Sequence, residues 1–582
     1  MLKSKYFYIT VLVSILFGFL PTLLLFATLG FYPHIPVEIM DDMLYYFARV
    51  REVLAGHMFI GNPYFLEHVH DVTTAFFVGD WIYASVFFIA QFFHVELTGG
   101  IIASQVVCTA VTSVLLFIFY KKIEIPEKYI PWVVTCTLLS VLFFILRPVS
   151  MAIVYPCFLL FLINFLAWLR NPKGKKESVF LVISSVLSFY VYTYLWQIVL
   201  IALSVTFVYV LVTHQNRLRF IVLAGLIGLL SIPVFIYTWM QLHAPYYFET
   251  LSRVGLVNTH SIGSKAILYS LLCLISLLSI FIIERKLHHK NEIGKTFPSI
   301  LYSISPENLF FSIIFISLLI AGVSNVISGK DLEVAVHVGR FTELFTTMFL
   351  MYITWVYAVH RNVLGKKFVV LIAIFFIYIS TLVFSTYATV SHTSTLVSQE
   401  SYAPVIRALS ESNSKPSVVF ADDTLSSYIV AQTNDYVVFH PNGLLYLASN
   451  VEIEERYLVS RMFSNLTEDQ IKTDMRKYAG VGLTVHEANV ENRNTRICMV
   501  FRRVILSSHC RQMMTGESIA GEQYFANLFL RYQYILSHKE KFLDMYHVQF
   551  IVIDLNHNWM PAALTSFKQI RSNDRFIILE RK

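Results

Sequence analysis

The chain has 582 residues, of which 56% are hydrophobic and 14% are charged, and its formal net charge is +7. Soluble globular proteins carry about 25% charged residues, so this composition excludes a soluble enzyme, a disordered scaffold and a disulfide-rich secreted domain. Apolar runs of about 20 residues, each long enough to cross a bilayer, recur along the first two thirds of the sequence. The sequence therefore predicts a polytopic α-helical membrane protein. The positive charge does not indicate a nucleic-acid partner, because many basic residues lie between apolar runs.

The first apolar run covers Tyr6–Leu29 and follows Lys3 and Lys5. A cleaved signal peptide is the competing interpretation, but the run is long and no clear small-residue cleavage site follows it. A mixed segment, 31–75, comes next and is the predicted first extracytoplasmic loop. Together the apolar runs predict about 11–13 transmembrane helices. The later runs lie at 76–93, 99–120, 130–146, 150–169, 178–193, 196–213, 220–241, 266–283, 309–322, 341–360 and 368–389.

The basic residues of the short connections predict the orientation, because cytoplasmic loops carry an excess of Lys and Arg. The alternate connections hold few: Arg147, Arg253, Lys265, Lys330 and Arg340. The other connections hold many, and we expect them in the cytoplasm: Lys121, Lys122, Lys128, Arg170, Lys173, Lys175, Lys176, Arg217, Arg219, Arg285, Lys286, Lys290, Lys295, Arg361, Lys366 and Lys367. One conflict arises. If the N-terminus is cytoplasmic and 76–93 crosses fully, the later basic loops fall outside, so either 76–93 is re-entrant or another crossing is miscounted.

The chain changes character after a transmembrane domain that covers 1–391. Residues 392–582 are polar and contain no run long enough to span, and they alternate short strands with helices, which predicts a soluble α/β domain. This domain follows Lys366 and Lys367 by one crossing, so we expect it to be extracytoplasmic. Its predicted strands are Ser417–Phe420, Tyr436–Phe439, His547–Asp554 and Arg575–Leu579, with a long helix around Tyr524–Leu543.

Short sequence patterns in this tail predict helix caps, and two cysteines raise the question of a disulfide bond. Thr467 and Gln470 form a capping box, and the pair 422–423 is interpreted as the cap of a helix. Cys498 and Cys510 are the only cysteines in polar sequence. The strand-like segment Met499–Leu506 would hold their ends apart, which disfavours a bond between them, although an oxidising compartment would permit one.

The polar segment 31–75 gathers ionisable residues next to the membrane. It begins with Asp41 and Asp42, which precede an apolar helix face typical of a helix lying in the membrane interface. That face consists of Leu44, Phe47, Ala48, Val50, Val53 and Leu54. Two adjacent carboxylates can bind a divalent cation or accept a proton from a hydroxyl group. The segment ends with Glu67, His68, His70 and Asp71.

This loop resembles that of the GT-C superfamily of membrane glycosyltransferases, which includes protein O-mannosyltransferases, lipid A aminoarabinose transferases and oligosaccharyltransferase catalytic subunits. A second match is His337–Glu343, whose Arg–aromatic pair opens a late apolar run. The plan of about a dozen crossings followed by an extracytoplasmic α/β tail is also similar. The oligosaccharyltransferase Trp-Trp-Asp-Tyr-Gly signature and the paired prolines of the other two branches are absent from the sequence. The loop residues that carry the resemblance are Asp41, Asp42, Tyr45, Tyr46, Asn62, Pro63 and Glu67.

The resemblance implies transfer of a sugar from a polyprenyl-phosphate-linked donor in the membrane to an extracytoplasmic protein, lipid or glycan. Asp41 or Asp42 would accept the proton of the incoming hydroxyl group. If a divalent cation such as Mg²⁺ or Mn²⁺ takes part, Asp41, Asp42 and Glu67 would be its ligands. The leaving phosphate needs positive charge, for which Arg340 and Arg253 are the candidates. Tyr45, Tyr46, His68 and His337 are further candidate site residues.

Each candidate also has a purely structural interpretation. An acidic pair can be solvated surface, His68 and His70 can be ordinary loop histidines, and Arg340 can snorkel to headgroups. Arg147, beside Pro148, is interpreted as a lipid-facing anchor. A cluster of aromatic residues is interpreted as an interfacial belt, with a sugar platform as the alternative: Tyr190, Tyr192, Tyr194 and Trp196.

Two other classes of protein compete with a transferase. A transporter or flippase places ionisable residues inside its crossings, near the midplane of the membrane. The runs 99–120, 220–241 and 309–322 contain no Asp, Glu, Lys or Arg, which favours an enzyme with its site at the membrane surface. A non-catalytic partner protein with the same fold is the third hypothesis.

Overall fold

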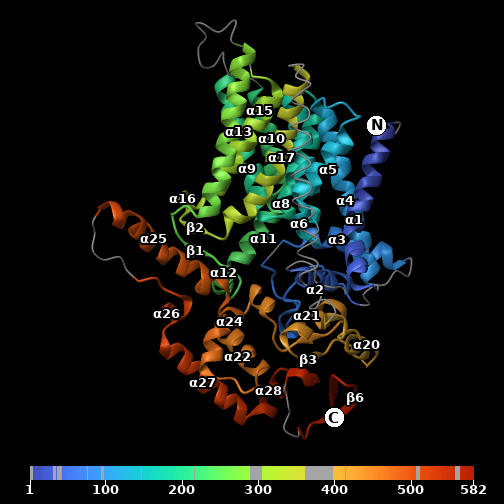
Figure 1. Ribbon diagram of the computed structural model, residues 1–582, viewed down its shortest axis with the longest axis vertical. Coiled ribbons are helices and arrows are strands. Elements are labelled where there is room, and N and C mark those ends of the chain that lie inside the picture. Colours follow the sequence, from blue (N-terminus) through green and yellow to red (C-terminus); the bar gives the residue numbers. More distant parts are fainter. Residues whose placement is uncertain are drawn as a thin grey trace.

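The computed structural model describes residues 4–30, 35, 42–74, 76–92, 97–145, 147–214, 216–288, 304–360, 398–412, 415–505, 512–557 and 564–582. A long helical bundle forms one end of the molecule, and a smaller part with a sheet forms the other (Figure 1). Among the described residues, four helices are long and apolar enough to cross a membrane. They are Gly99–Lys122, Ser150–Arg170, Thr193–Thr213 and Ser264–Ile282, and the bent pair Arg217–Leu230 and Ile232–Leu242 would make a fifth span. These helices agree with the predicted helical membrane protein.

One break in the helical bundle coincides with a proline. The helices α10 and α11 meet at an angle of 48°, and Pro233 in the first turn of α11 removes a backbone donor at that break. The helices of the bundle are α1 (Lys5–Leu29), α4 (Leu97–Lys122), α5 (Ile130–Ser140), α6 (Leu142–Ile145), α7 (Ser150–Arg170), α8 (Lys175–Val191), α9 (Thr193–Thr213), α10 (Arg217–Leu230), α11 (Ile232–Leu242), α13 (Ser264–His288), α15 (Pro306–Gly322) and α17 (Val334–His360).

The helices α1 and α4 pack closely and run in opposite directions. Phe7 near the start of α1 meets Phe117 near the end of α4, with ring centroids 5.5 Å apart. Halfway along, Gly18 lies so close to α4 that a Cβ atom there would be 2.6 Å from the Cα atom of Val106. The helix α4 therefore starts at the end of the bundle where α1 finishes and where the loop 31–75 begins.

Helix α3 (Val78–Phe92), which covers the predicted run 76–93, does not traverse the bundle. Its first turn is tied to α2 (Met43–Leu54) by the ion pair between Asp80 and Arg49. Towards its end, the ring of Phe87 would be 2.8 Å from a Cβ atom at Gly100, at the start of α4. Both ends of α3 thus lie at the same end of the bundle, which is the arrangement expected if the segment 76–93 is re-entrant.

The described members of the two sets of basic residues lie at opposite ends of the bundle. At the end that carries the N-terminus, Ser4 donates a hydrogen bond to Glu127, which also pairs with Lys121. Arg170 at the end of α7 pairs with Glu307 at the start of α15. At the opposite end, Arg147 pairs with Asp42 at the start of α2, Arg253 contacts the C-terminal part, and Lys330 and Arg340 lie just before and within the first turns of α17.

The C-terminal part contains a five-stranded mixed sheet with the order β4-β3-β5-β7-β6. The strands are β3 (Val418–Phe420), β4 (Tyr436–Val437), β5 (Val548–Asp554), β6 (Phe567–Ser572) and β7 (Phe576–Arg581). The first three are parallel, and β7 and β6 add antiparallel pairs. All four predicted strands are found. The strand β6 was not predicted, because it lies at the edge and buries only Phe567, so it has no apolar pattern.

The helices of this part are α20 (Ala403–Ser412), α21 (Asp423–Gln432), α22 (Asn450–Ser460), α23 (Glu468–Thr473), α24 (Met475–Val481), α25 (Ala488–Ile505), α26 (Gly516–Ala520), α27 (Glu522–Ser537) and α28 (Lys539–Met545). The predicted capping box of Thr467 and Gln470 is confirmed. Asp422 caps α21 by accepting bonds from two backbone amides. The long helix predicted around Tyr524–Leu543 is broken at His538 into α27 and α28.

The strand predicted for Met499–Leu506 is wrong, because α25 extends to Ile505. The apolar residues Ile497, Val500, Phe501 and Val504 follow a spacing of three and four, which is the period of a helix. Cys498 on this helix is disulfide-bonded. A disulfide at Cys498 runs against the expectation from the sequence, which disfavoured one. Cys510, the candidate partner, lies outside the described residues, as does the predicted domain boundary at 391–392.

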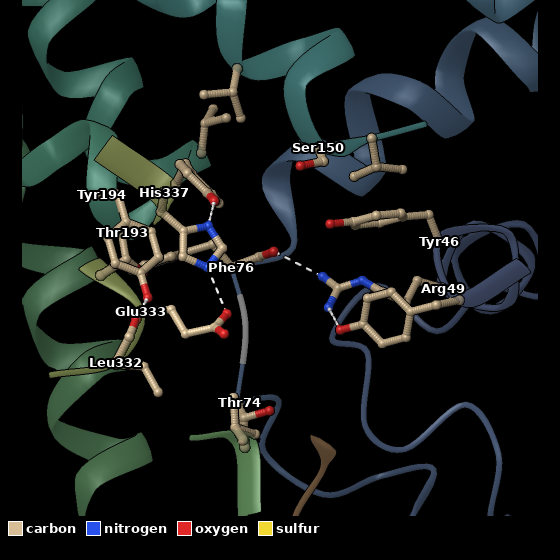
Figure 2. A pocket seen from close by; sticks show the side chains of 17 residues that line it. Tyr46, Arg49, Thr74, Phe76, Ser150, Thr193, Tyr194, Leu332, Glu333 and His337 are labelled. Carbon is tan, nitrogen blue, oxygen red and sulfur yellow. Dashed lines mark hydrogen bonds and ion pairs between the residues drawn. The ribbon is translucent and has the colours of Figure 1, made fainter. Parts of the chain in front are cut away.

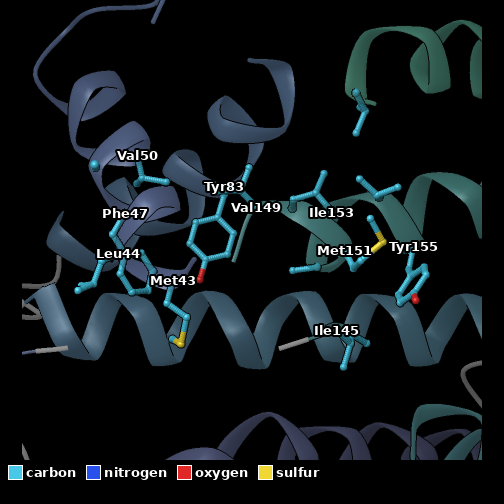
Figure 3. Packing of buried hydrophobic residues seen from close by; sticks show 14 of the residues in the cluster. Met43, Leu44, Phe47, Val50, Tyr83, Ile145, Val149, Met151, Ile153 and Tyr155 are labelled. Carbon is cyan, nitrogen blue, oxygen red and sulfur yellow. The ribbon is translucent and has the colours of Figure 1, made fainter. Parts of the chain in front are cut away.

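Helix α2 does not present its predicted apolar face to the surroundings, because it is covered by α3 on one side and by α21 on the other (Figure 1). Leu44 and Phe47 belong to the same buried apolar cluster as Tyr83 of α3 (Figure 3). On the other side, Arg51 lies 4.8 Å from the ring of Tyr436 in the C-terminal part. Ion pairs are what allow charged side chains of α2 to be buried there.

Candidate functional site

A cavity of about 240 Å³ lies at the end of the bundle that faces the C-terminal part. Three segments form most of its wall: α2, the connection between α8 and α9, and the start of α17. The residues around it are Tyr45, Tyr46, Arg49, Thr74, Phe76, Gly79, Val149, Ser150, Val154, Val191, Tyr192, Thr193, Tyr194, Val254, Leu332, Glu333 and His337. Figure 2 shows Tyr194, His337 and Glu333 along one wall, with Tyr46 and Arg49 across from them.

His337 is fixed on three sides by its neighbours. Its Nδ1 atom lies 2.6 Å from the Tyr192 hydroxyl oxygen. Its ring stacks on Tyr194, with centroids 4.2 Å apart and planes inclined by 6°. The Nε2 atom lies 3.9 Å from the carboxylate of Glu333, one helical turn earlier. The imidazole therefore has one defined orientation, with a phenol at one nitrogen and a carboxylate near the other.

Glu333 connects this group to the C-terminal part. Its other carboxylate oxygen lies 3.1 Å from Nε2 of His486, in the π-helical turn Gly482–Glu487. The hydrogen bond with His486 lowers the pKa of the Glu333 carboxyl. The short ribbon of β1 (Val257–Asn258) and β2 (Lys330–Asp331) leads directly into Glu333 and holds this segment in place.

The opposite wall is fixed by a buried ion pair. Arg49 donates two hydrogen bonds to the carboxylate of Asp80, at 2.9 and 2.5 Å, and both side chains are buried. Arg49 also donates to the hydroxyl oxygen of Tyr45, at 3.1 Å, and to the carbonyl oxygen of Phe76. The pair thus positions the Tyr45 phenol. Next to it, burial raises the pKa of Tyr46.

Strained backbone conformations surround the cavity. Asp42, Val149 and Glu333 have φ values of 71°, 58° and 52°, a region that non-glycine residues seldom adopt and that is most costly for a β-branched residue such as Val149. Val149 and Glu333 line the cavity, and Asp42 begins the helix that carries Tyr45 and Tyr46. Strain of this kind is concentrated at functional sites, where the surrounding structure maintains it.

The structure describes one residue of the predicted acidic pair, Asp42. Asp41 lies outside the described residues. Asp42 forms an ion pair with Arg147, at the turn before α7. Arg147 is therefore not the lipid-facing anchor that its position beside Pro148 suggested; its charge acts on Tyr46 and Tyr192 of the cavity.

Arg340 is buried one turn beyond His337, with its guanidinium 5.7 Å from the ring centroid of Phe144. Within the described part of the chain, no hydrogen bond or ion pair is found for this guanidinium. Burial raises the pKa of the Tyr192 phenol, and the charges of Arg340 and Arg147 oppose that rise. Two arginines therefore act on one phenol of the cavity wall.

Arg253, the second predicted phosphate ligand, is instead a clamp on the C-terminal part. Its guanidinium donates to three backbone carbonyls of the segment 444–448 and to the side-chain oxygen of Asn450. It is 3% exposed, and burial lowers its pKa to about 10. Its donors are already used, which removes the physical basis for the predicted role.

The predicted residues Glu67 and His68 also lie at the contact with the C-terminal part rather than at the cavity. Glu67 pairs with Arg456 of α22. His68 lies between Asp71 and Glu452, at 2.6 and 2.9 Å. No group of three or more His, Cys, Asp or Glu side chains suitable for a metal ion occurs among the described residues, so the predicted cation site rests on Asp41 and stays a prediction.

Several residues of the cavity were not predicted from the sequence. Arg49 could have been noticed, since an arginine on the apolar face of α2 requires a buried partner, and Asp80 lies in the next apolar run. Tyr192 and Tyr194 were assigned to an aromatic belt, whereas they line the cavity. Glu333 has no local signal, because its partner His486 comes from a distant segment.

No protein-family model matches the sequence, and no curated protein matches it. The function is therefore inferred from the geometry of the cavity.

Proposed function

We propose that the protein is an integral-membrane glycosyltransferase that moves a sugar from a polyprenyl-phosphate-linked donor to an extracytoplasmic acceptor. One observation carries the proposal. Tyr45 and Tyr46 belong to the first sequence segment that resembles GT-C enzymes, and His337 belongs to the second. All three line the same cavity, although nearly three hundred residues separate the two segments.

The size and position of the cavity support this function. A volume of about 240 Å³ lies below the range of about 300–1,000 Å³ typical of sites for drug-sized ligands, so it suits one sugar residue better than an oligosaccharide. The cavity lies where apolar helices end, which lets the polyprenyl tail of the donor stay in the bilayer. Aromatic side chains such as Tyr46 and Tyr192 offer apolar faces and hydroxyl groups to a sugar.

The two arginines near the cavity suit a phosphate leaving group. As the bond between the anomeric carbon and the phosphate oxygen breaks, negative charge grows on the phosphate. Arg340 forms no ion pair with a described residue, although the Glu343 carboxylate is near enough to interact with it electrostatically, and Arg147 has one exposed partner, Asp42. Preorganised positive charge of this kind stabilises the transition state because it needs no rearrangement during the reaction. The resemblance also implies inversion at the anomeric carbon.

The proposed topology has about eleven crossings. Four of the described helices, or five with the bent pair, are long and apolar enough to cross. In this proposal ten passes would come from α1, α4, α5 with α6, α7, α8, α9, α10 with α11, α13, α15 and α17. The predicted run 368–389 is the eleventh. With α3 left out, a cytoplasmic N-terminus puts the strongly basic end of the bundle in the cytoplasm, and the cavity and the C-terminal part on the extracytoplasmic side.

The test is transfer of radiolabelled sugar from synthetic short-chain polyprenyl-phosphate sugars by the protein reconstituted in liposomes. We expect Arg340→Ala to lower kcat/KM by about 100-fold or more, the usual effect of removing a group that stabilises developing charge. Lys330→Ala, an exposed cation at the same end, is the matched control and should retain wild-type activity.

A wild-type protein that transfers none of a panel of such sugars, but moves an intact lipid-linked sugar from one leaflet to the other, would overturn the proposal in favour of a flippase. Equal activity of Arg340→Ala and wild type would show that the phosphate does not bind at this end of α17.

A further inference from the structure

The wall of the cavity contains a row of polar groups, each within hydrogen-bonding or ion-pairing distance of the next. It runs from the hydroxyl group of Tyr192 to Nδ1 of His337, 2.6 Å away, and from Nε2 to the carboxylate of Glu333, 3.9 Å away. The other oxygen of Glu333 lies 3.1 Å from Nε2 of His486. Tyr192, His337 and Glu333 line the cavity, whereas His486 lies behind it.

The fold holds this row of groups in place. The stacked ring of Tyr194 fixes the plane of the His337 imidazole, and the hydroxyl group of Tyr194 is itself tied to the carbonyl oxygen of Leu332. Glu333 adopts a φ of 52°, a conformation that costs energy for a glutamate. The bond with His486 and the ribbon β1–β2 keep Glu333 in this conformation, which directs its carboxylate towards both histidines.

We propose that Tyr192, His337 and Glu333 form the proton relay that activates the acceptor hydroxyl group, with His486 as a positioning residue. This inference rests on the proposed glycosyltransferase function. It assigns the base to the α8–α9 connection and α17, rather than to the acidic pair of the first loop.

The oxygen of the acceptor hydroxyl forms a bond with the anomeric carbon, and the bond from that carbon to the phosphate oxygen breaks. The acceptor proton passes to the Tyr192 oxygen as the Tyr192 proton passes to Nδ1 of His337. The imidazole then carries a positive charge, which the Glu333 carboxylate stabilises. The electron pair of the broken bond leaves on the phosphate, beside Arg340 and Arg147.

The charges around the imidazole explain why the relay would work only with donor bound. Arg340 and Arg147 oppose a positive charge on His337, whereas Glu333 favours it, and Tyr192 and Tyr194 are neutral. His486 and Lys265 in turn face Glu333. A phosphate held by the two arginines would offset their charge, so proton transfer and departure of the phosphate would assist each other.

The alternative, which the resemblance to GT-C enzymes implies, is a base in the first loop. Asp42 is paired with Arg147, which competes with a role as proton acceptor. The relay, by contrast, has its phenol oxygen at the cavity and a proton acceptor behind it. Substitutions in both places therefore discriminate between the two sites for the base.

The experiment compares Tyr192→Phe, His337→Asn and Glu333→Gln with wild type in the liposome assay. We expect each variant to lower kcat by 100-fold or more with a KM close to wild type, within the range of general-base catalysis. Tyr190→Phe is the matched control, because the Tyr190 phenol bonds to the carbonyl oxygen of Leu230 and does not line the cavity. It should retain wild-type kcat.

His486→Ala tests the positioning role. It should lower kcat and displace the pH–rate profile, because Glu333 loses its fixed orientation, while His486→Gln, which retains a side-chain donor, should restore part of the rate. A merely structural role would lower the yield of folded protein without moving the pH profile of the remaining enzyme.

The outcomes separate this inference from the proposed function. If wild type transfers sugar and Arg340→Ala does not, but Tyr192→Phe and His337→Asn keep the wild-type rate and pH profile, the relay is refuted and the glycosyltransferase stands. If wild type itself transfers no sugar, the proposed function fails first. Loss of activity in Asp42→Asn with unchanged activity in His337→Asn would likewise place the base in the first loop.

Discussion

Arg456 of α22 forms an ion pair with Glu67, at 2.9 Å, across 389 positions of the sequence. Its guanidinium lies between two aromatic rings, 4.3 Å from the centroid of Phe65 and 4.5 Å from that of Tyr546. The side chain is 2% exposed and also bonds to Glu452. This single arginine therefore joins the first loop to the sheet-bearing part of the protein.

Arg456→Ala should destabilise the protein strongly. It removes the partner of two carboxylates and leaves a gap between two rings, so we expect a loss of about 2–4 kcal/mol in the free energy of unfolding. Arg407→Ala, on an exposed position of α20, should change stability by less than about 0.5 kcal/mol. Thermal unfolding in detergent measures both. Similar melting temperatures for the two variants would contradict the assigned role of Arg456.

His68 makes the same contact sensitive to alkaline pH. Its hydrogen bonds with Asp71 and Glu452 raise the pKa of the imidazole from 6.5 to about 9. A raised pKa stabilises the folded state below pH 6.5, and this stabilisation is lost as the pH rises towards 9. The melting temperature of wild type should therefore fall over this interval relative to that of His68→Gln. Parallel curves for the two proteins would refute the assignment.

His440 should act at acidic pH, with the opposite sign. It stacks on Tyr64 with ring centroids 4.8 Å apart and accepts a hydrogen bond from the backbone amide of Asn442. Burial lowers its pKa from 6.5 to about 4. The unfolded chain then binds a proton that the folded chain excludes, so stability should fall as the pH decreases from 6.5 to 4. His440→Gln should reduce this slope, measured by thermal unfolding at a series of pH values.

The path of α3 can be tested by labelling single cysteines in sealed vesicles. In a cysteine-free background, cysteines at positions Asp71 and Phe92 should react with a membrane-impermeant maleimide from the same side, because both ends of α3 lie at one end of the bundle. A cysteine at Glu124 should react from the opposite side. Labelling of positions 71 and 124 from a common side, with position 92 labelled from the other, would show that α3 crosses the membrane.

Features that depend on neighbouring residues could be predicted from the sequence. The strand Val548–Asp554, the capping box of Thr467 and Gln470, and the cap at Asp422 all follow from patterns within a few positions. The path of α3 could not be predicted, because an apolar run of this length has the same composition whether it crosses a membrane or turns back. Only its contacts with Arg49 and Gly100 distinguish the two.

Part of the candidate site could be predicted from the types of residue that the sequence places near the membrane surface. Tyr45, Tyr46 and His337 were identified and line one cavity. Arg253 was predicted to bind phosphate and Glu67 to bind a metal ion, because both are charged residues predicted to lie near the membrane surface. Their structural partners, the carbonyl of Leu444 and the guanidinium of Arg456, lie 191 and 389 positions away, a distance at which no local pattern reports a contact.

The contact between Glu67 and Arg456 also has a consequence for biosynthesis. A ribosome adds about 5–20 residues per second, so the 389 positions between the partners correspond to about 20–80 s of translation. During that time the first loop, including Glu52 and Tyr64, which are fully buried in the finished protein, has emerged without the surface that covers it. The loop is thus a candidate client for chaperones on the side of the membrane where it emerges, and slower elongation would lengthen its dependence on them.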